Sequence, residues 1–223
     1  MRTTTIMAGG LAGALLCLMG CGVDPGIRQP PRTDAKLRVR IQDPKADADF
    51  RAAQEKWTRR AEIYDRMDAR SFFAATLLTP DFVEAMNARD ASIGLDPLPE
   101  AASSNGCPPA VLLGAYMHDS RLDDFTHKKS IWRVSLKTGD GSEFRPAKIK
   151  RIGRPDHRLR TSFPFLDRFW VGYLITFERE GAPCGEGQVP DVSWEGSVLE
   201  LNSIVGRAAM RFGADPDAPS AAR

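Results

Sequence analysis

Residues 169–177 read Phe-Trp-Val-Gly-Tyr-Leu-Ile-Thr-Phe, and every second residue of this stretch is aromatic or large and apolar. The alternating set is Phe169, Val171, Tyr173, Ile175 and Phe177. Because successive side chains of a strand point to opposite faces, this spacing puts all of them on one face of a β-strand. This stretch is the clearest strand signal in the chain, and it favours a mainly β fold.

Further strand signals lie on both sides of it and are separated by turn residues. The predicted strands cover residues 111–117, 131–137, 148–152, 169–177, 198–205 and 208–212. Within 131–137, Trp132, Val134 and Leu136 alternate and share one face. Ile149 and Ile152 break the period of two, which predicts a bulge in their strand. The last two strands are expected to be hinged near Gly206.

Residues 47–92 carry a mainly helical pattern. Apolar residues recur at intervals of three and four at Phe50, Ala53, Trp57, Ala61, Tyr64 and Met67. This stripe predicts an amphipathic helix that begins near Asp47 or Asp49, either of which can cap it. The apolar run that follows, 71–79, is interpreted as a strand, although a continued helix fits it too. Thr79 and Pro80 then predict the start of a second, short helix.

The helix followed by about seven strands predicts a mainly β fold of the immunoglobulin-like type, a two-sheet β-sandwich. The sandwich is expected to span residues 93–212, with 71–79 as a possible first strand. A mixed α+β sheet is the alternative. Residues 213–223 are predicted to be a disordered tail.

The N-terminal residues have the pattern of an export signal. Arg2 is the only charge among the first 20 residues, and the residues from Ile6 to Leu18 are apolar. A bilayer span needs about 20 apolar residues, so this shorter run fits the hydrophobic region of a signal peptide. The run ends in Leu18-Met19-Gly20-Cys21, which resembles the lipobox of bacterial lipoprotein precursors. An ordinary signal peptide with an incidental cysteine, or a short membrane anchor, is the alternative.

The resemblance covers residues 1–22 and implies a lipid anchor. Residues 1–20 would be a cleaved signal peptide, and Cys21 would carry diacylglycerol and usually an acyl chain on its new amine. Residue 22 is Gly rather than Asp, which favours the outer membrane over retention in the inner membrane. Residues 21–46 are polar and rich in proline, and they predict a flexible tether behind the anchor.

The remaining cysteines of the mature chain are Cys107 and Cys184, each of which is flanked by proline and glycine. A compartment beyond the cytoplasm lets disulfides persist, so we expect these two residues to pair. Two separate thiols are the alternative.

Basic residues gather near the middle of the chain, opposed only by Asp156. They are Arg145, Lys148, Lys150, Arg151, Arg154, Arg158 and Arg160. If they lie on one edge, they form a patch for anionic headgroups, phosphates or an acidic partner. The alternative is an edge strand and loop kept soluble by charge.

The possible metal ligands His118, Asp119, Asp123, Asp124 and His127 fall within ten residues. We interpret them as a polar loop after a buried strand, with calcium at the three aspartates as the alternative. No metal and no cofactor is expected, because the spacings of known metal-binding and phosphate-binding motifs are absent.

Lys and Arg number 31 against 29 Asp and Glu, a formal net charge of +2, which disfavours nucleic acid as a partner. The expected function is therefore a non-catalytic binding or assembly module, anchored in the bacterial cell envelope and contacting other envelope proteins. The chain is not expected to be an enzyme. An envelope hydrolase that uses His118, His127 or His157 is kept as an alternative.

Overall fold

A computed structural model describes residues 43–65, 68–92, 108–153, 157–179 and 193–213. The helices in these ranges are α1 (Pro44–Trp57), α2 (Pro80–Ser92), α3 (His157–Ser162) and the short 3-10 helix η1 (Ser120–Leu122). The strands are β1 (Thr58–Asp65), β2 (Asp68–Leu77), β3 (Ala110–Met117), β4 (Arg133–Lys137), β5 (Glu143–Ile152), β6 (Val171–Arg179), β7 (Val198–Ser203) and β8 (Gly206–Arg211). No helix in the described ranges is long and apolar enough to cross a membrane.

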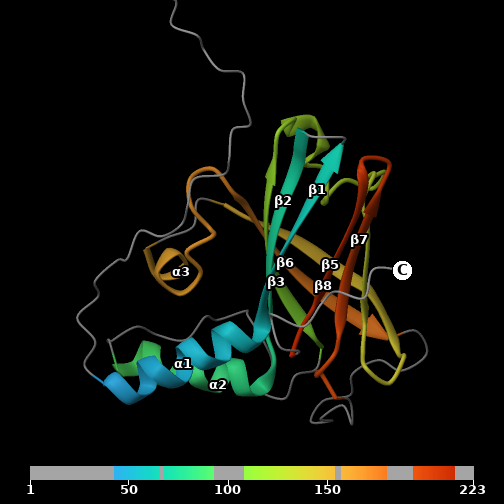
Figure 1. Ribbon diagram of the computed structural model, residues 1–223. Helices are drawn as coiled ribbons and strands as arrows, with labels where there is room; N and C mark the ends of the chain where they lie inside the picture. The colour runs from blue at the N-terminus through green and yellow to red at the C-terminus, as the bar shows by residue number, and fades with distance from the viewer. Residues whose placement is uncertain (1–42, 66–67, 93–107, 154–156, 180–192, 214–223) are drawn as a thin grey trace, which may run out of the picture.

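The prediction of an immunoglobulin-like two-sheet sandwich is wrong. All of these strands form one antiparallel eight-stranded sheet, in the order β1-β2-β3-β6-β5-β4-β7-β8. The sheet curls until β1 packs against β8, so that it is nearly closed into a barrel (Figure 1). A Cβ built on Gly206 of β8 would lie 2.6 Å from Ile63 Cγ2 of β1, which shows how close the two ends come. The alternation of apolar residues along a strand shows which side chains face the interior. It is the same in a curled single sheet as in a two-sheet sandwich, so it does not distinguish the two folds.

The predicted helix of residues 47–67 is also wrong at both ends. α1 begins at Pro44, where the Asp43 carboxylate accepts hydrogen bonds from the amides of Lys45 (2.9 Å) and Ala46 (3.3 Å). It ends at Trp57, and the following residues form β1. A register irregularity between Ile63 and Tyr64 breaks the period of two in β1, which hid this strand among helical spacings.

Most other predicted elements are confirmed. The run at 71–79 lies in β2, and the runs at 111–117 and 131–137 correspond to β3 and β4. β5 is irregular between Pro146 and Lys148 and not between Ile149 and Ile152, where the bulge was predicted. α2 begins at Pro80, with the Thr79 hydroxyl accepting from the Phe82 amide (3.4 Å). The strand predicted at 169–177 begins two residues later, at Val171. Phe169 lies before the strand and is 47% exposed.

Aromatic rings fill the interior of the curled sheet. Trp132 stacks on Phe125 with ring centroids 5.1 Å apart, and Phe73 meets Trp132 edge-on at 5.4 Å. Phe125 also contacts Tyr173 of β6 at 5.1 Å. The Trp132 indole N–H donates to the Leu122 carbonyl (2.7 Å), so its one polar group is satisfied inside the core.

The outer face of β2, β3 and β6 is covered as well. Ala74, Gly114 and Gly172 are paired in register and form a row of small residues across the three strands. Over this row lie the side chains of Phe165, Leu166 and Trp170. A Cβ on Gly114 would come within 2.6 Å of Phe165 Cδ2, so only a glycine admits the ring at this distance. This cover explains why β2 and β3 are buried on both faces.

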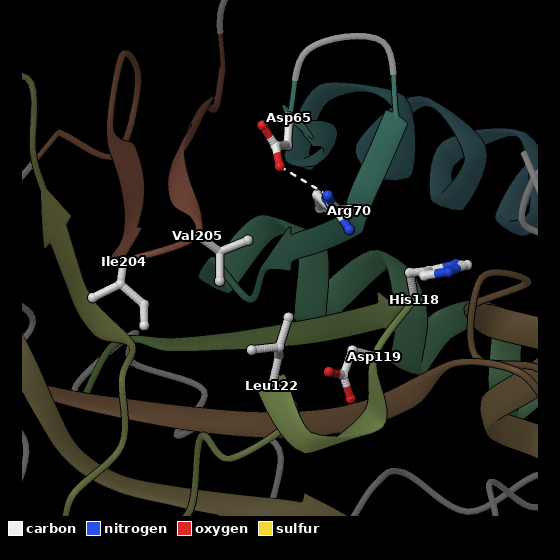
Figure 2. A pocket seen from close by; sticks show the side chains of 7 residues that line it. All are labelled: Asp65, Arg70, His118, Asp119, Leu122, Ile204 and Val205. Carbon is white, nitrogen blue, oxygen red and sulfur yellow. Dashed lines mark hydrogen bonds and ion pairs between the residues drawn. The ribbon is translucent and has the colours of Figure 1, made fainter.

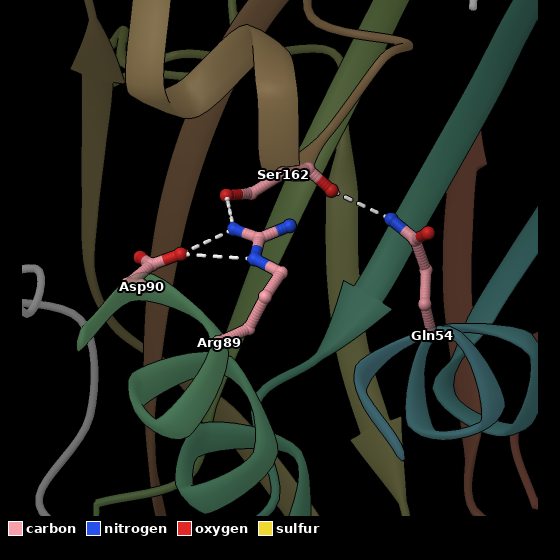
Figure 3. Close-up of polar contacts among 4 residues, drawn as sticks. All are labelled: Gln54, Arg89, Asp90 and Ser162. Atoms are coloured by element: carbon pink, nitrogen blue, oxygen red, sulfur yellow. Dashed lines mark hydrogen bonds and ion pairs between the residues drawn. The ribbon is translucent and has the colours of Figure 1, made fainter. Parts of the chain in front are cut away.

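A buried ion pair joins the helices (Figure 3). Arg89 and Asp90, in the last turn of α2, have side chains only 5% and 3% exposed. The Arg89 guanidinium donates to the Asp90 carboxylate and to the Ser162 hydroxyl of α3. It also lies 3.9 Å from the ring centroid of Phe50, while Gln54, also of α1, donates to the Ser162 carbonyl (2.6 Å). One buried charge therefore connects all three α-helices.

Replacing Gly114 tests the close approach of the Phe165 ring. We expect Gly114→Ala to lower the free energy of unfolding by about 1–3 kcal/mol, because the buried ring has to shift. Urea denaturation of the two proteins measures this difference. The matched control is Gly153→Ala, where the added carbon meets nothing within 4 Å. Equal midpoints for wild type and Gly114→Ala would contradict the packing described.

The buried ion pair predicts strong coupling between its members. Asp90→Ala should cost about 3–5 kcal/mol, because the Arg89 charge stays buried without its carboxylate. The double change Arg89→Met/Asp90→Leu should cost less than the two single changes together, since it removes both charges. A double-mutant cycle by urea unfolding measures the coupling. The exposed pair Arg70 and Asp65 serves as the control and should show about 0–1 kcal/mol.

Candidate functional site

Strand β5 is paired with β6 along most of its length but with β4 only at its start. Its partner β6 follows it from Phe144 to Ile152. On the other side β4 pairs only with Glu143 and Phe144, so the two strands diverge after the hairpin. In Figure 1, β5 and β6 run obliquely to the upright β7. Within the described ranges, the register of β5 with β4 therefore covers Glu143 and Phe144, whereas its register with β6 extends to Ile152.

Three of the predicted basic residues share the outer face of β5. Arg145, Lys148 and Lys150 stand opposite Glu178, Thr176 and Leu174 of β6 in the strand register. We call Arg145, Lys148 and Lys150 the β5 basic face. Lys148 and Lys150 line a hollow of about 280 Å³ together with Leu174 and Thr176. The hollow thus combines two ammonium groups with one apolar and one hydroxyl side chain.

The structure separates the other predicted basic residues from this face. Arg151 is directed to the loop after β3, where its guanidinium pairs with Asp123 (3.3 Å). Arg160 is exposed on α3. Arg154 and the side chain of Arg158 lie outside the described residues. Among the residues that can be placed, Arg145, Lys148 and Lys150 therefore lie together on β5, and the anion-binding role predicted for the cluster stays a prediction.

A second hollow lies at one end of the barrel (Figure 2). It measures about 360 Å³ and is lined by Asp65, Arg70, His118, Asp119, Leu122, Ile204 and Val205. Arg70 pairs with Asp65 across it (2.8 Å). Ile204, at the turn between β7 and β8, is 87% exposed. Of its acidic lining residues, Asp65 is paired with Arg70 and Asp119 is paired with Arg121 of η1.

The carboxylates of the 118–127 loop are each occupied by separate partners. Asp119 caps η1 and binds the Arg121 guanidinium (2.7 Å). Asp123 accepts from the Tyr173 hydroxyl as well as from Arg151. Asp124 accepts from the Ser130 hydroxyl (2.9 Å) and the Ile131 amide (3.0 Å). Across the part of the chain that can be described, no three His, Cys, Asp or Glu side chains gather to hold a metal.

These contacts shift two pKa values. Hydrogen bonds from Arg121 hold the pKa of the Asp119 carboxyl at about 2. Burial, followed by the hydrogen bond to Asp123, raises the pKa of Tyr173 far above its ordinary value. At neutral pH Asp119 is therefore an anion and Tyr173 is a neutral hydrogen-bond donor.

The histidines proposed for a hydrolase are not assembled into a catalytic group. His118 and His127 are exposed, and neither imidazole has a hydrogen-bond partner among the residues that the structure describes. The side chain of His157 lies outside them.

Several predictions lie on residues that the structure does not describe. They are the signal peptide 1–20, the lipobox with Cys21, most of the tether 21–46, the pair Cys107 and Cys184, and nearly all of the tail 213–223. Leu174 and Thr176 were missed as part of a site, because only strand pairing brings them beside the lysines. Pro146 was the available signal for the short pairing of β5 with β4, since proline lacks the amide that a strand paired on both sides needs.

Neither a scan against protein-family models nor searches of curated proteins and of solved structures found a match to this chain.

The Asp119–Arg121 pair predicts a pH effect whose direction is set by the lowered pKa. We expect Arg121→Gln to raise the pKa of Asp119 from about 2 toward the ordinary carboxyl value, because its main hydrogen bonds are lost. In wild type, the stability from this pair is present above the unfolded pKa and is lost as the pH falls toward the folded pKa. A carboxyl-carbon NMR titration measures the shift. Arg133→Gln, at an exposed position of β4, is the control and should leave Asp119 unchanged.

Proposed function

We propose that this protein is a lipid-anchored, non-catalytic binding or assembly module of the bacterial cell envelope. The lipobox-like residues that end at Cys21 support the proposal of a lipid anchor. The described fold begins at Asp43 and α1, which is consistent with a folded module that follows a tether. A tether over residues 22–42 has a reach of about 25 Å as a flexible coil. Confinement to a membrane plane would raise the local concentration of the module toward membrane partners.

The binding role is argued from the exposed basic side chains of β5. Helices and aromatic side chains cover the outer face of β2 and β3, whereas Arg145, Lys148 and Lys150 of β5 are exposed. Exposed basic side chains gathered on one strand are a feature that a partner of opposite charge can recognise. The described residues provide no comparable group of catalytic side chains.

The anchor is tested by Cys21→Ser. We expect the variant to remain uncleaved or unlipidated and to leave the detergent phase when cell lysates are partitioned. Cys17→Ser, inside the predicted signal peptide, is the matched control and should still partition into detergent. Normal partitioning of Cys21→Ser into detergent would refute a lipid anchor at Cys21.

A second candidate function is binding of an anionic glycolipid or a phosphate group. The hollow lined by Lys148, Lys150, Leu174 and Thr176 favours it, because it brings two basic side chains together with an apolar one. Arg151 belongs less to such a site, since it is already paired with Asp123.

This candidate predicts salt-sensitive binding to vesicles that contain an anionic phospholipid. A chain that begins at Gly22 is used, so that neither the lipid anchor nor the apolar residues 6–18 bind the vesicle. We expect Lys148→Glu/Lys150→Glu to reduce cosedimentation strongly, and raised salt to reduce it for the unreversed chain. Lys128→Glu/Lys129→Glu makes the same charge change in an exposed loop and is the control. Equal cosedimentation of both reversed variants would rule out the hollow as the binding site.

A further inference from the structure

We infer that the turn between β7 and β8 inserts into the surface of a phospholipid bilayer, with Ile204 among the acyl chains and with Arg133 and Arg207 at the phosphate groups. The inference rests on the proposed lipid anchor and specifies which end of the folded module meets the membrane. It is carried by the exposed apolar side chains at this end, by the arginines behind the turn and by the length of chain before α1.

The first feature is a set of exposed apolar side chains at one end of the sheet. Ile204, in the β7–β8 turn, is 87% exposed, and Tyr64, near the end of β1, is 57% exposed. Ile63 packs against Gly206, which puts the neighbouring Tyr64 and the turn at the same end. Val205 of the turn lines the hollow of Figure 2. Aliphatic side chains and tyrosine suit a bilayer surface, where the apolar parts leave water and the hydroxyl stays hydrated.

The second feature is a pair of exposed arginines behind the turn. Arg133 of β4 and Arg207 of β8 both stand opposite Asn202 of β7, so they share one face of the sheet. Ile204 is two residues beyond Asn202, about 7 Å along the strand. This matches the depth of about 5–10 Å to which an apolar face enters a bilayer. Arg207 also pairs with Glu200 (2.7 Å), but a guanidinium has five N–H donors and can bind a phosphate as well.

Two of the carboxylates at this end are already paired with arginines. Asp65 pairs with Arg70 (2.8 Å), and Asp119 pairs with Arg121 (2.7 Å). Asp68, at the start of β2, is exposed, and an anionic surface would repel it. A zwitterionic phosphatidylcholine surface offers the arginines the same phosphate groups without a net charge, so the test uses phosphatidylcholine.

The third feature is the length of chain between Cys21 and α1. Figure 1 shows α1 and α2 at the end of the sheet opposite the β7–β8 turn. The 10 residues of β2 measure about 33 Å along the sheet. Residues 22–42 span at most about 70 Å when extended, so an anchor at Cys21 lets either end of the module reach the membrane. The exposed apolar and basic side chains select the end that carries the turn.

The test uses the full lipidated chain, reconstituted into phosphatidylcholine vesicles whose acyl chains carry bromine near the headgroup. Bromine quenches tryptophan fluorescence on contact. Ile204→Trp places a reporter in the turn, and Arg211→Trp places a matched reporter at the other end of the same hairpin, opposite Val198. Both positions are exposed, so both variants should fold. After subtraction of the wild-type fluorescence, we expect bromine to remove most of the added signal at residue 204 and almost none at residue 211.

Neutralising the arginines tests their contribution. Arg133→Gln/Arg207→Gln, made together with Ile204→Trp, should restore much of the quenched fluorescence, because the turn then loses its phosphate contacts. Lys148→Gln/Lys150→Gln removes the same charge from β5 and is the matched control, which should leave the quenching unchanged. An equal effect of the two pairs would mean that total charge rather than the end of the sheet directs the contact, and would overturn the inference.

Flotation with the vesicles separates a failure of the anchor from a failure of the contact. A chain that floats with the vesicles but shows no quenching at residue 204 would refute the contact and leave the anchored module in place. A chain that does not float would refute both the anchor and the contact. Equal quenching at residues 204 and 211 would show that the hairpin meets the lipid without a preferred end, and it would overturn the inference as well.

Discussion

The ring of Phe165 lies directly on the backbone of Gly114, and the burial of the outer side of this part of the sheet depends on the contact. A side chain at that position would hold the ring away, because even a Cβ would stand 2.6 Å from it. With Ala74 and Gly172 in the same row, three strands accept a second layer of apolar side chains. The wall made of β2, β3 and β6 is therefore buried on its outer side as well as toward the barrel interior.

This cover makes the barrel asymmetric. The buried Arg89 and Asp90 pair joins α1, α2 and α3, and its desolvated charges tolerate little displacement of the helices. β5 is the next strand after β6 in the sheet. Its outer face carries basic residues, whereas the outer face of β2, β3 and β6 carries small and apolar ones. β2 and β3 are mostly buried, whereas Arg145, Lys148 and Lys150 of β5 are exposed, and this difference is the basis of the proposed binding role.

Sequence reasoning succeeded where a local pattern has one physical meaning. The alternation of Trp132, Val134 and Leu136 predicted their common buried face, and Thr79 with Pro80 predicted the start of α2. It failed at β1, because Ala61 and Tyr64 continue a helical spacing by coincidence and an irregularity interrupts the strand period. The prediction of a two-sheet sandwich also failed, because inward-facing residues alternate in the same way in a sandwich and in a curled single sheet.

The sequence by itself determined the mainly β class, the approximate position of most strands and the concentration of basic residues around β5. Only the tertiary structure decided that β3 pairs with β6, that β4 leaves β5 after the hairpin, and that Arg151 is directed away from Lys148 and Lys150. The reason is that backbone hydrogen bonds between strands are the same for nearly every residue. Strand order and the extent of each pairing therefore depend on the path of the whole chain rather than on any local pattern.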